Sequence, residues 1–132
     1  FALTPTEREA RIALSNQTDS LEYVANSLLE KTGAANLFLK LGSEGVVAYC
    51  TSQETGFLER QHFPALCVNP VDVAGAGDAM LATVAAVTTA DFSAIEAAAV
   101  ATVASNIAVR TMGNHPIKLK DIMNYSFSRK FC

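Results

Sequence analysis

The chain has 132 residues, of which half are apolar and 17% are charged, and its formal net charge is −3. This balance is typical of a folded globular domain, because disordered chains are poor in apolar residues and rich in charge. The lysines and arginines are mostly scattered, which argues against a nucleic-acid partner, since neutralising phosphates requires clustered positive charge. The longest nearly uncharged stretch, residues 97–109, is too short to cross a bilayer, so we expect no membrane partner and a cytoplasmic protein.

A helix start is the first recognisable signal in the chain. Residues 4–7 (T-P-T-E) place Thr4 as the capping residue, Pro5 in the first turn and Glu7 as the acid that completes a capping box. We therefore expect a short helix that ends near Leu14.

The following segments predict a second helix and a group of strands. The helix begins after Asp19 or Ser20, carries apolar residues at helical spacing and ends at Gly33, a residue suited to the left-handed C-cap conformation. Short apolar runs around a glycine-containing turn predict three strands, the last at a sheet edge, over residues 37–39, 46–50 and 57–63.

The second half of the chain is predicted to be mainly helical. An extended stretch, residues 67–73, leads into a glycine-rich turn. Three helices are expected after the turn, the first two rich in alanine and the second capped by Asp91 or Ser93, over residues 79–89, 93–110 and 118–128. Helices that alternate with strands and then continue as a helical run predict an α/β layered domain.

The segment with the most chemical information is residues 72–78 (D-V-A-G-A-G-D). Gly75 and Gly77 permit a tight turn and remove the side chains that would keep a ligand away from the backbone. The N–H groups of Ala76, Gly77 and Asp78 then form the unsatisfied first turn of a helix, which is a favourable site for an anion.

Asp78 places a carboxylate beside this anion site. Phosphoryl transfer explains the combination, because a carboxylate can take the proton of an attacking hydroxyl while the N–H groups stabilise charge on the transferred group. The alternative for G-A-G-D alone is a plain turn in which Asp78 is a local cap. A dinucleotide-binding fingerprint is excluded, because G-x-G-x-x-G requires glycine where the chain has Met80.

The D-x-x-G-A-G-D motif before an alanine-rich helix resembles the second signature of the ribokinase-like (PfkB) carbohydrate kinases, and with Val73 it most resembles their heptose-phosphate kinase branch. Residues 4–9 (T-P-T-E-R-E) are similar to the family's P-N-x-x-E segment, and residues 40–45 (K-L-G-S-E-G) to its T-x-G-x-x-G nucleotide loop. Residues 106–113 resemble the helix and loop beside adenine. The resemblance covers most of the chain and implies a three-layer, Rossmann-like α/β sheet flanked by helices.

By that resemblance, the chain is expected to belong to an ATP-dependent kinase that phosphorylates a hydroxyl of a sugar or sugar phosphate. Asp78 would be the catalytic base, and the anion hole would be formed by Gly75, Ala76 and Gly77. The resemblance also implies five contacts to the nucleotide, at Lys40, Gly42, Gly45, Thr102 and Asn106.

The family resemblance further implies metal ions. Glu9 would help to organise hydrated Mg²⁺, whereas Asp72, with carbonyl groups around Ala74 and Gly113, would correspond to the monovalent-cation site of some members. The residues alone leave a simpler alternative for Glu9, which is a solvated charge on the first turn of a helix.

Three positions depart from the family pattern. Thr6 stands where asparagine is usual, Lys40 stands where threonine is usual, and Ala74 offers no hydroxyl group. Lys40 can pair with a phosphate or can be a solvated strand end. These departures keep a second hypothesis open, in which the chain is a non-catalytic nucleotide-binding or scaffold domain that retains the fold.

The resemblance also implies that family members are longer than this chain and that residues 1–132 correspond to their C-terminal, nucleotide-binding and catalytic part. The chain opens without Met, on residues 1–3 that resemble the end of a buried strand. We expect the N-terminal half, with most of the sugar pocket and the lid, to lie outside it, and this half or a second chain to cover the exposed sheet edge. Little or no kinase activity is expected from residues 1–132 alone.

Overall fold

The structure is a computed structural model that describes residues 2–67, 69–113 and 115–128. The chain divides into two compact units, Phe1–His62 and Phe63–Cys132. We call them the N-terminal unit and the C-terminal unit and describe each by itself.

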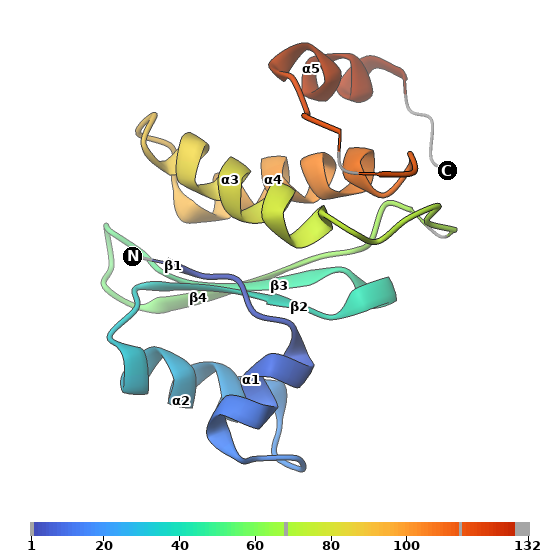
Figure 1. Cartoon of the computed structure of the whole chain (residues 1–132). Coiled ribbons are helices and arrows are strands. Elements are labelled where there is room, and N and C mark those ends of the chain that lie inside the picture. The colour runs from blue at the N-terminus through green and yellow to red at the C-terminus, as the bar shows by residue number, and fades with distance from the viewer. Residues whose placement is uncertain (1, 68, 114, 129–132) are drawn as a thin grey trace. The chain divides into compact units, whose positions relative to one another are not determined.

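The N-terminal unit is a sheet with two helices packed against it (Figure 1). Its strands follow chain order across the sheet and are β1 (Ala2–Leu3), β2 (Asn36–Lys40), β3 (Val46–Thr51) and β4 (Leu58–Phe63). β1 and β2 pair in parallel, whereas β2 and β3 pair antiparallel with Phe38 opposite Ala48. Two helices, α1 (Glu7–Leu14) and α2 (Leu21–Thr32), connect β1 to β2. β4 lies at the edge, as the sequence predicts.

The core of the N-terminal unit lies between the helices and the sheet. Alternate residues of β2 and β3 pack against one face of each helix, in a cluster of Ala10, Val24, Ala25, Leu28, Leu37, Leu39, Val47 and Tyr49. Phe38 points to the opposite sheet face from its neighbours in β2 and is also fully buried. Burial on both faces explains why this strand has a continuous apolar run instead of an alternating pattern.

The start of α1 differs from the sequence prediction. Thr6 is the N-cap residue in place of Thr4, and Glu9 closes the capping box in place of Glu7. The Thr6 N–H donates to Oε2 of Glu9 at 2.7 Å, and the Glu9 N–H donates to Oγ1 of Thr6 at 3.2 Å. The predicted cap is wrong because Thr6 forms a parallel bridge with Lys40, which keeps the chain extended for longer than the local signal indicates.

The C-terminal unit is helical and contains α3 (Ala76–Thr88), α4 (Ala94–Ala108) and α5 (Leu119–Ser128). Helices α3 and α4 run side by side (Figure 1), and α5 contacts α4. Four buried alanines line α4, namely Ala97, Ala98, Ala101 and Ala104. Because the separation of packed elements depends on the side chains at the contact, buried residues this small allow a neighbouring element to approach α4 closely.

Other helix ends follow the sequence signals. Ser20 caps α2, Gly33 ends it with a φ of 67°, and Ser93 caps α4. Helix α3 starts at Ala76, three residues before the predicted start, because the end of the glycine-rich turn is already helical. Across the described ranges, none of the helices has the length and apolar character needed to cross a membrane. Helices and a sheet in this order confirm the prediction of an α/β protein.

Candidate functional site

The glycine-rich turn, residues 72–78, runs directly into the start of α3. Gly75 is the N-cap residue and has a φ of 80°, in the left-handed region that glycine adopts without steric cost. Ala76, Gly77 and Asp78 are the first three residues of the helix. The structure therefore brings these four residues together within a single turn of backbone.

No side chain in the described part of the chain caps the N-terminus of α3. Thr6, Ser20 and Ser93 accept hydrogen bonds from the first turns of α1, α2 and α4, whereas Gly75 has no side chain to do so. Among the described residues, the N–H groups of Gly77 and Asp78 have no acceptor. The prediction that the Ala76 N–H is also free is wrong, because this N–H donates to the Val73 carbonyl oxygen at 3.5 Å. Two backbone donors at the positive end of a helix dipole are thus available to an anion.

The carboxylate of Asp78 is exposed in the first turn of α3. Within the part of the chain that the structure describes, it takes part in no hydrogen bond or ion pair. An unpaired carboxylate next to free N–H donors can accept a proton from a group that the donors hold in place.

The carboxylate of Asp72 accepts two backbone hydrogen bonds at the start of the glycine-rich turn. Its Oδ1 accepts a hydrogen bond from the Ala74 N–H at 2.9 Å, and its Oδ2 accepts one from the Gly113 N–H at 3.1 Å. Donation from Ala74, and then from Gly113, lowers the pKa of Asp72 because it favours the charged form. Asp72 thus ties the glycine-rich turn to the loop that follows α4.

The C-terminal end of α4 contacts the same turn at two further places. The carbonyl oxygen of Val109 accepts hydrogen bonds from the N–H groups of Val71 at 2.8 Å and Asp72 at 3.2 Å. The hydroxyl of Ser105 donates to the carbonyl oxygen of Ala76 at 3.1 Å. The position of the turn is therefore fixed by α4 and its following loop as well as by its own glycines.

The predicted nucleotide loop lies in the N-terminal unit. Lys40 ends β2, a 3₁₀ turn spans Gly42–Glu44, and Gly45 follows with a φ of 95°. The Gly45 N–H donates to the Gly42 carbonyl at 3.1 Å, which closes the turn. Gly42 also has a positive φ, 61°, so a side chain at either glycine would be strained.

Glu9 lies near this loop, because the bridge between Thr6 and Lys40 joins the start of α1 to the end of β2. Hydrogen bonds from the backbone and the side chain of Thr6, followed by the charge of Lys40, lower the pKa of Glu9. Its carboxylate is thus engaged in capping through Oε2. The described residues contain no group of three or more His, Cys, Asp or Glu side chains that could hold a metal ion.

Thr102 and Asn106 lie one turn apart on α4 and are both buried. The Thr102 hydroxyl donates to the Ala98 carbonyl of its own helix at 2.9 Å. Asn106 is only 4% exposed, and neither polar atom of its side-chain amide has a hydrogen-bond partner among the described residues. A buried amide without partners costs free energy, so its presence needs a reason beyond packing.

Two contacts near these loops were not anticipated from the sequence. Nε2 of His62, on β4, lies 2.7 Å from the carbonyl oxygen of Glu44 in the 3₁₀ turn, in place to donate to it. Ser105 bonds to the start of α3. Each contact joins residues far apart in the chain, 18 and 29 positions, so no local pattern signals either one.

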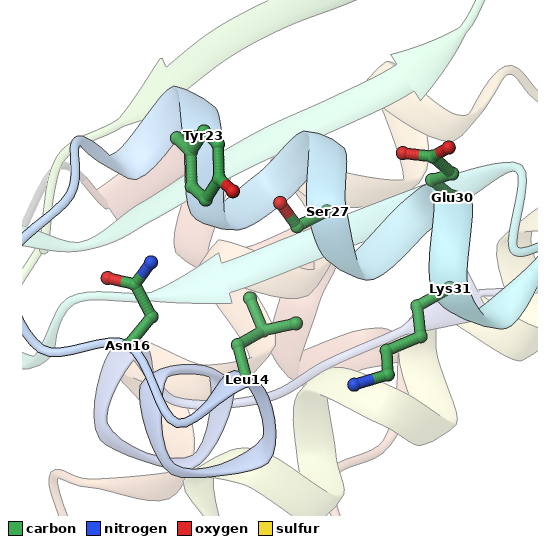
Figure 2. Close-up of a pocket in the computed structure, with 6 residues that line it drawn as sticks. All are labelled: Leu14, Asn16, Tyr23, Ser27, Glu30 and Lys31. Atoms are coloured by element: carbon green, nitrogen blue, oxygen red, sulfur yellow. The ribbon is translucent and has the colours of Figure 1, made fainter.

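A pocket of about 400 Å³ lies elsewhere in the N-terminal unit, between the end of α1 and helix α2 (Figure 2). It is lined by Leu14, Asn16, Tyr23, Ser27, Glu30 and Lys31. None of the site residues predicted from the sequence lines this pocket, and Asn16 already donates to Asp19.

Comparison with known proteins defines the class. The family model described as pfkB family carbohydrate kinase matches residues 1–119, and the chain belongs to this family. The prediction that the chain belongs to the PfkB carbohydrate kinase family is therefore confirmed.

The individual relatives agree with this assignment. The chain is 32% identical to the bifunctional protein HldE of Pelobacter propionicus over 92% of its length, and it spans 25% of that protein. The ribokinase of Thermotoga maritima superposes with a TM-score of 0.80 at 26% identity, covering 96% of this chain and 42% of that structure. An Arabidopsis thaliana ribokinase complexed with ribose and ATP shares the fold, with a TM-score of 0.75 at 23% identity, over 93% of this chain and 39% of that structure. The chain thus spans about a quarter of the HldE protein that it matches.

Proposed function

We propose that this chain carries the nucleotide-binding and catalytic part of an ATP-dependent kinase for a sugar or sugar-phosphate hydroxyl. The observation that carries the proposal is the start of α3, where the N–H groups of Gly77 and Asp78 find no acceptor among the described residues and lie beside an exposed carboxylate. Membership of the carbohydrate kinase family supplies the type of reaction.

Asp78 acts as the base in this proposal. The acceptor hydroxyl oxygen forms a bond to the γ-phosphorus of ATP, its proton passes to the Asp78 carboxylate, and the bond from the γ-phosphorus to the bridging oxygen breaks to release ADP. The anion hole of Gly75, Ala76 and Gly77 stabilises the negative charge on the transferred group, because fixed donors need no reorganisation during the step.

The nucleotide is proposed to contact Lys40, Gly42 and Gly45 through its phosphates and ribose, and Thr102 and Asn106 near its adenine. The unpaired amide of Asn106 supports this role, because a base edge offers the donors and acceptors that the amide lacks. The adenine would reach this buried amide only after a local rearrangement.

Magnesium fits the site as a hydrated ion. Glu9 leaves Oε1 outside its capping bonds, and a single carboxylate with retained waters is a usual environment for Mg²⁺. When bound, the ion would screen the charges of the phosphates. A monovalent cation at Asp72 is part of the proposal, although both carboxylate oxygens already accept backbone N–H groups.

The rest of the enzyme lies outside this chain in the proposal, because the chain spans only a quarter of HldE and less than half of the ribokinase. We infer that the remaining residues of the polypeptide, or a second chain, supply most of the sugar pocket and cover the sheet edge. The HldE relative and the Val73 form of the motif favour an acceptor of the heptose-phosphate class. A cytoplasmic location belongs to the same proposal, since ATP is the donor.

The test uses the complete protein that contains this chain. ADP release from ATP is measured with a panel of free sugars and sugar phosphates, in the wild type, in Asp78→Asn and in the matched control Asp91→Asn. We expect Asp78→Asn to lower kcat by about 10²–10⁴-fold, with ADP affinity almost unchanged, because only the transition-state role is lost. Undiminished turnover in Asp78→Asn contradicts the proposal. ADP binding without transfer to any acceptor would instead favour the non-catalytic alternative.

A further inference from the structure

Ser105 differs from Thr83, Thr88 and Thr102, the other hydroxyl residues within α3 and α4. Thr83, Thr88 and Thr102 each donate to the carbonyl four residues earlier in their own helix, at 2.7 to 2.9 Å. This is the usual partner of a serine or threonine inside a helix. Ser105 instead donates to Ala76 on α3, at a distance of 3.1 Å.

The acceptor of this bond, the Ala76 carbonyl, belongs to the peptide group that also carries the Gly77 N–H. The carbonyl of Ala76 and the N–H of Gly77 are the two ends of one planar amide. In an α-helix this carbonyl also accepts the N–H four residues later, and its second lone pair remains available for Ser105. The Gly77 N–H at the other end has no acceptor among the described residues.

A hydrogen bond to an amide oxygen polarises the whole amide group. Electron density moves toward the oxygen, so the N–H at the other end becomes a stronger donor, and chains of hydrogen bonds reinforce one another in this way. The bond from Ser105 also fixes the plane of the amide, and therefore the direction of the Gly77 N–H.

We propose that Ser105 is a positioning residue that orients and polarises the Ala76–Gly77 peptide so that the Gly77 N–H binds the oxygens of a phosphoryl group. The catalytic role of Ser105 in this inference rests on the proposed function. The polarisation of the Ala76–Gly77 peptide by Ser105 does not depend on it. Asp72 and Val109 hold the approach to the turn, whereas Ser105 acts on the donor peptide itself.

The first test is spectroscopic and uses the complete protein labelled with ¹⁵N-glycine, with the Gly77 resonance assigned through a Gly77→Ala variant. In Ser105→Ala, the Gly77 amide resonance moves upfield, because the amide loses its polarising partner. Titration with inorganic phosphate is followed at the same resonance. The Kd for phosphate in Ser105→Ala is expected to be about fivefold higher than in the wild type. Ser105→Thr retains a hydroxyl and restores both values.

Thr83→Ala is the matched control, because it removes a hydroxyl that also bonds to a carbonyl of α3, but within the helix. It leaves the Gly77 resonance and the phosphate Kd unchanged. If Ser105→Ala folds as the wild type does and leaves both unchanged, the inference is overturned. Equal effects of Thr83→Ala and Ser105→Ala overturn it as well, because they indicate general loosening of the helices.

Kinetics with an acceptor found in the sugar panel then test the catalytic role. Ser105→Ala lowers kcat about fivefold and leaves the KM of the acceptor unchanged, because the anion hole acts on the transferred group. An unchanged kcat removes the catalytic role. If no acceptor is found, the proposed kinase activity fails, while the Gly77 resonance and the phosphate titration still decide the role of Ser105.

Discussion

Asp72 and Gly113 lie 41 residues apart in the chain and are joined by a 3.1 Å hydrogen bond from the Gly113 N–H to Oδ2 of the carboxylate. The same carboxylate accepts the Ala74 N–H through its other oxygen. One side chain thus connects the start of the glycine-rich turn with the loop after α4.

The first prediction concerns the stability of the folded protein at low pH. N–H donation from Ala74 and Gly113 lowers the pKa of Asp72 from its ordinary value of 3.8 in the folded protein. The ionised form therefore stabilises the fold above pH 3.8, and this contribution is lost as the pH falls through the lower, folded pKa.

Asp72→Asn should lower the unfolding midpoint at pH 7, and the difference from wild type should shrink as the pH falls below 3.8. Urea denaturation from pH 7 to pH 2 measures this difference. Asp91→Asn is the control, because Asp91 makes none of the hydrogen bonds or ion pairs of the described residues. A difference that stays constant over this pH range would show that the carboxylate charge is not the cause.

The second prediction separates two roles of Glu9. Glutamine is also a capping-box residue, so Glu9→Gln should keep the stability of α1 while removing the charge proposed to organise hydrated Mg²⁺. The Mg²⁺ concentration for half-maximal activity should rise severalfold. Thr6→Ala should behave in the opposite way, losing about 1 kcal/mol of stability with the Mg²⁺ requirement unchanged. Thermal unfolding and Mg²⁺ titrations measure both quantities, and equal effects of the two variants on Mg²⁺ would refute the distinction.

The third prediction concerns the side-chain amide of Asn106, for which residues 2–67, 69–113 and 115–128 provide no hydrogen-bond partner. Asn106→Leu replaces it with an apolar group of similar volume and should raise the free energy of unfolding by about 1–2 kcal/mol, because a buried unsatisfied amide is removed. If the amide contacts adenine, the same variant should weaken ADP binding. Chemical denaturation and ADP calorimetry measure the two effects. Thr102→Val is the control, since it removes a satisfied hydroxyl and should reduce stability. A lower free energy of unfolding in Asn106→Leu than in the wild type would contradict this prediction, because it would show that the amide stabilises the folded protein.

The fourth prediction concerns Cys50, a free and buried thiol on β3. Burial, followed by the charge of Glu59, raises its pKa to about 12. The reactive thiolate is therefore almost absent at pH 8, and iodoacetamide should leave Cys50 unmodified until the protein unfolds. Mass spectrometry of peptides from native and guanidinium-treated protein measures the modification. Rapid alkylation of Cys50 in the native protein is the contrary result.

Local signals in the sequence predict most of the elements. Gly33 ends α2 and Ser93 caps α4, because the physical cause of each lies within a few residues of the signal. The D-V-A-G-A-G-D motif likewise predicts a turn into a helix, since Gly75 is the residue that adopts the positive φ.

Contacts between distant residues account for what the sequence does not predict. The cap of α1 moves from Thr4 to Thr6 because Thr6 pairs with Lys40, a strand residue far along the chain. Ser105 has the sequence appearance of an ordinary helix residue, and only the packing of α4 against α3 shows its partner, Ala76. The roles of Asp78 and the nucleotide contacts remain predictions for experiment.

Ala97, Ala98, Ala101 and Ala104 are buried on α4, the helix that packs against α3 and carries Ser105. An added methyl or larger group at Ala101 or Ala104 would act as a wedge and push Ser105 away from the Ala76 carbonyl. Substitutions at these alanines are thus expected to disturb the Ser105 hydrogen bond as well as the packing, although none of these alanines has a reactive group.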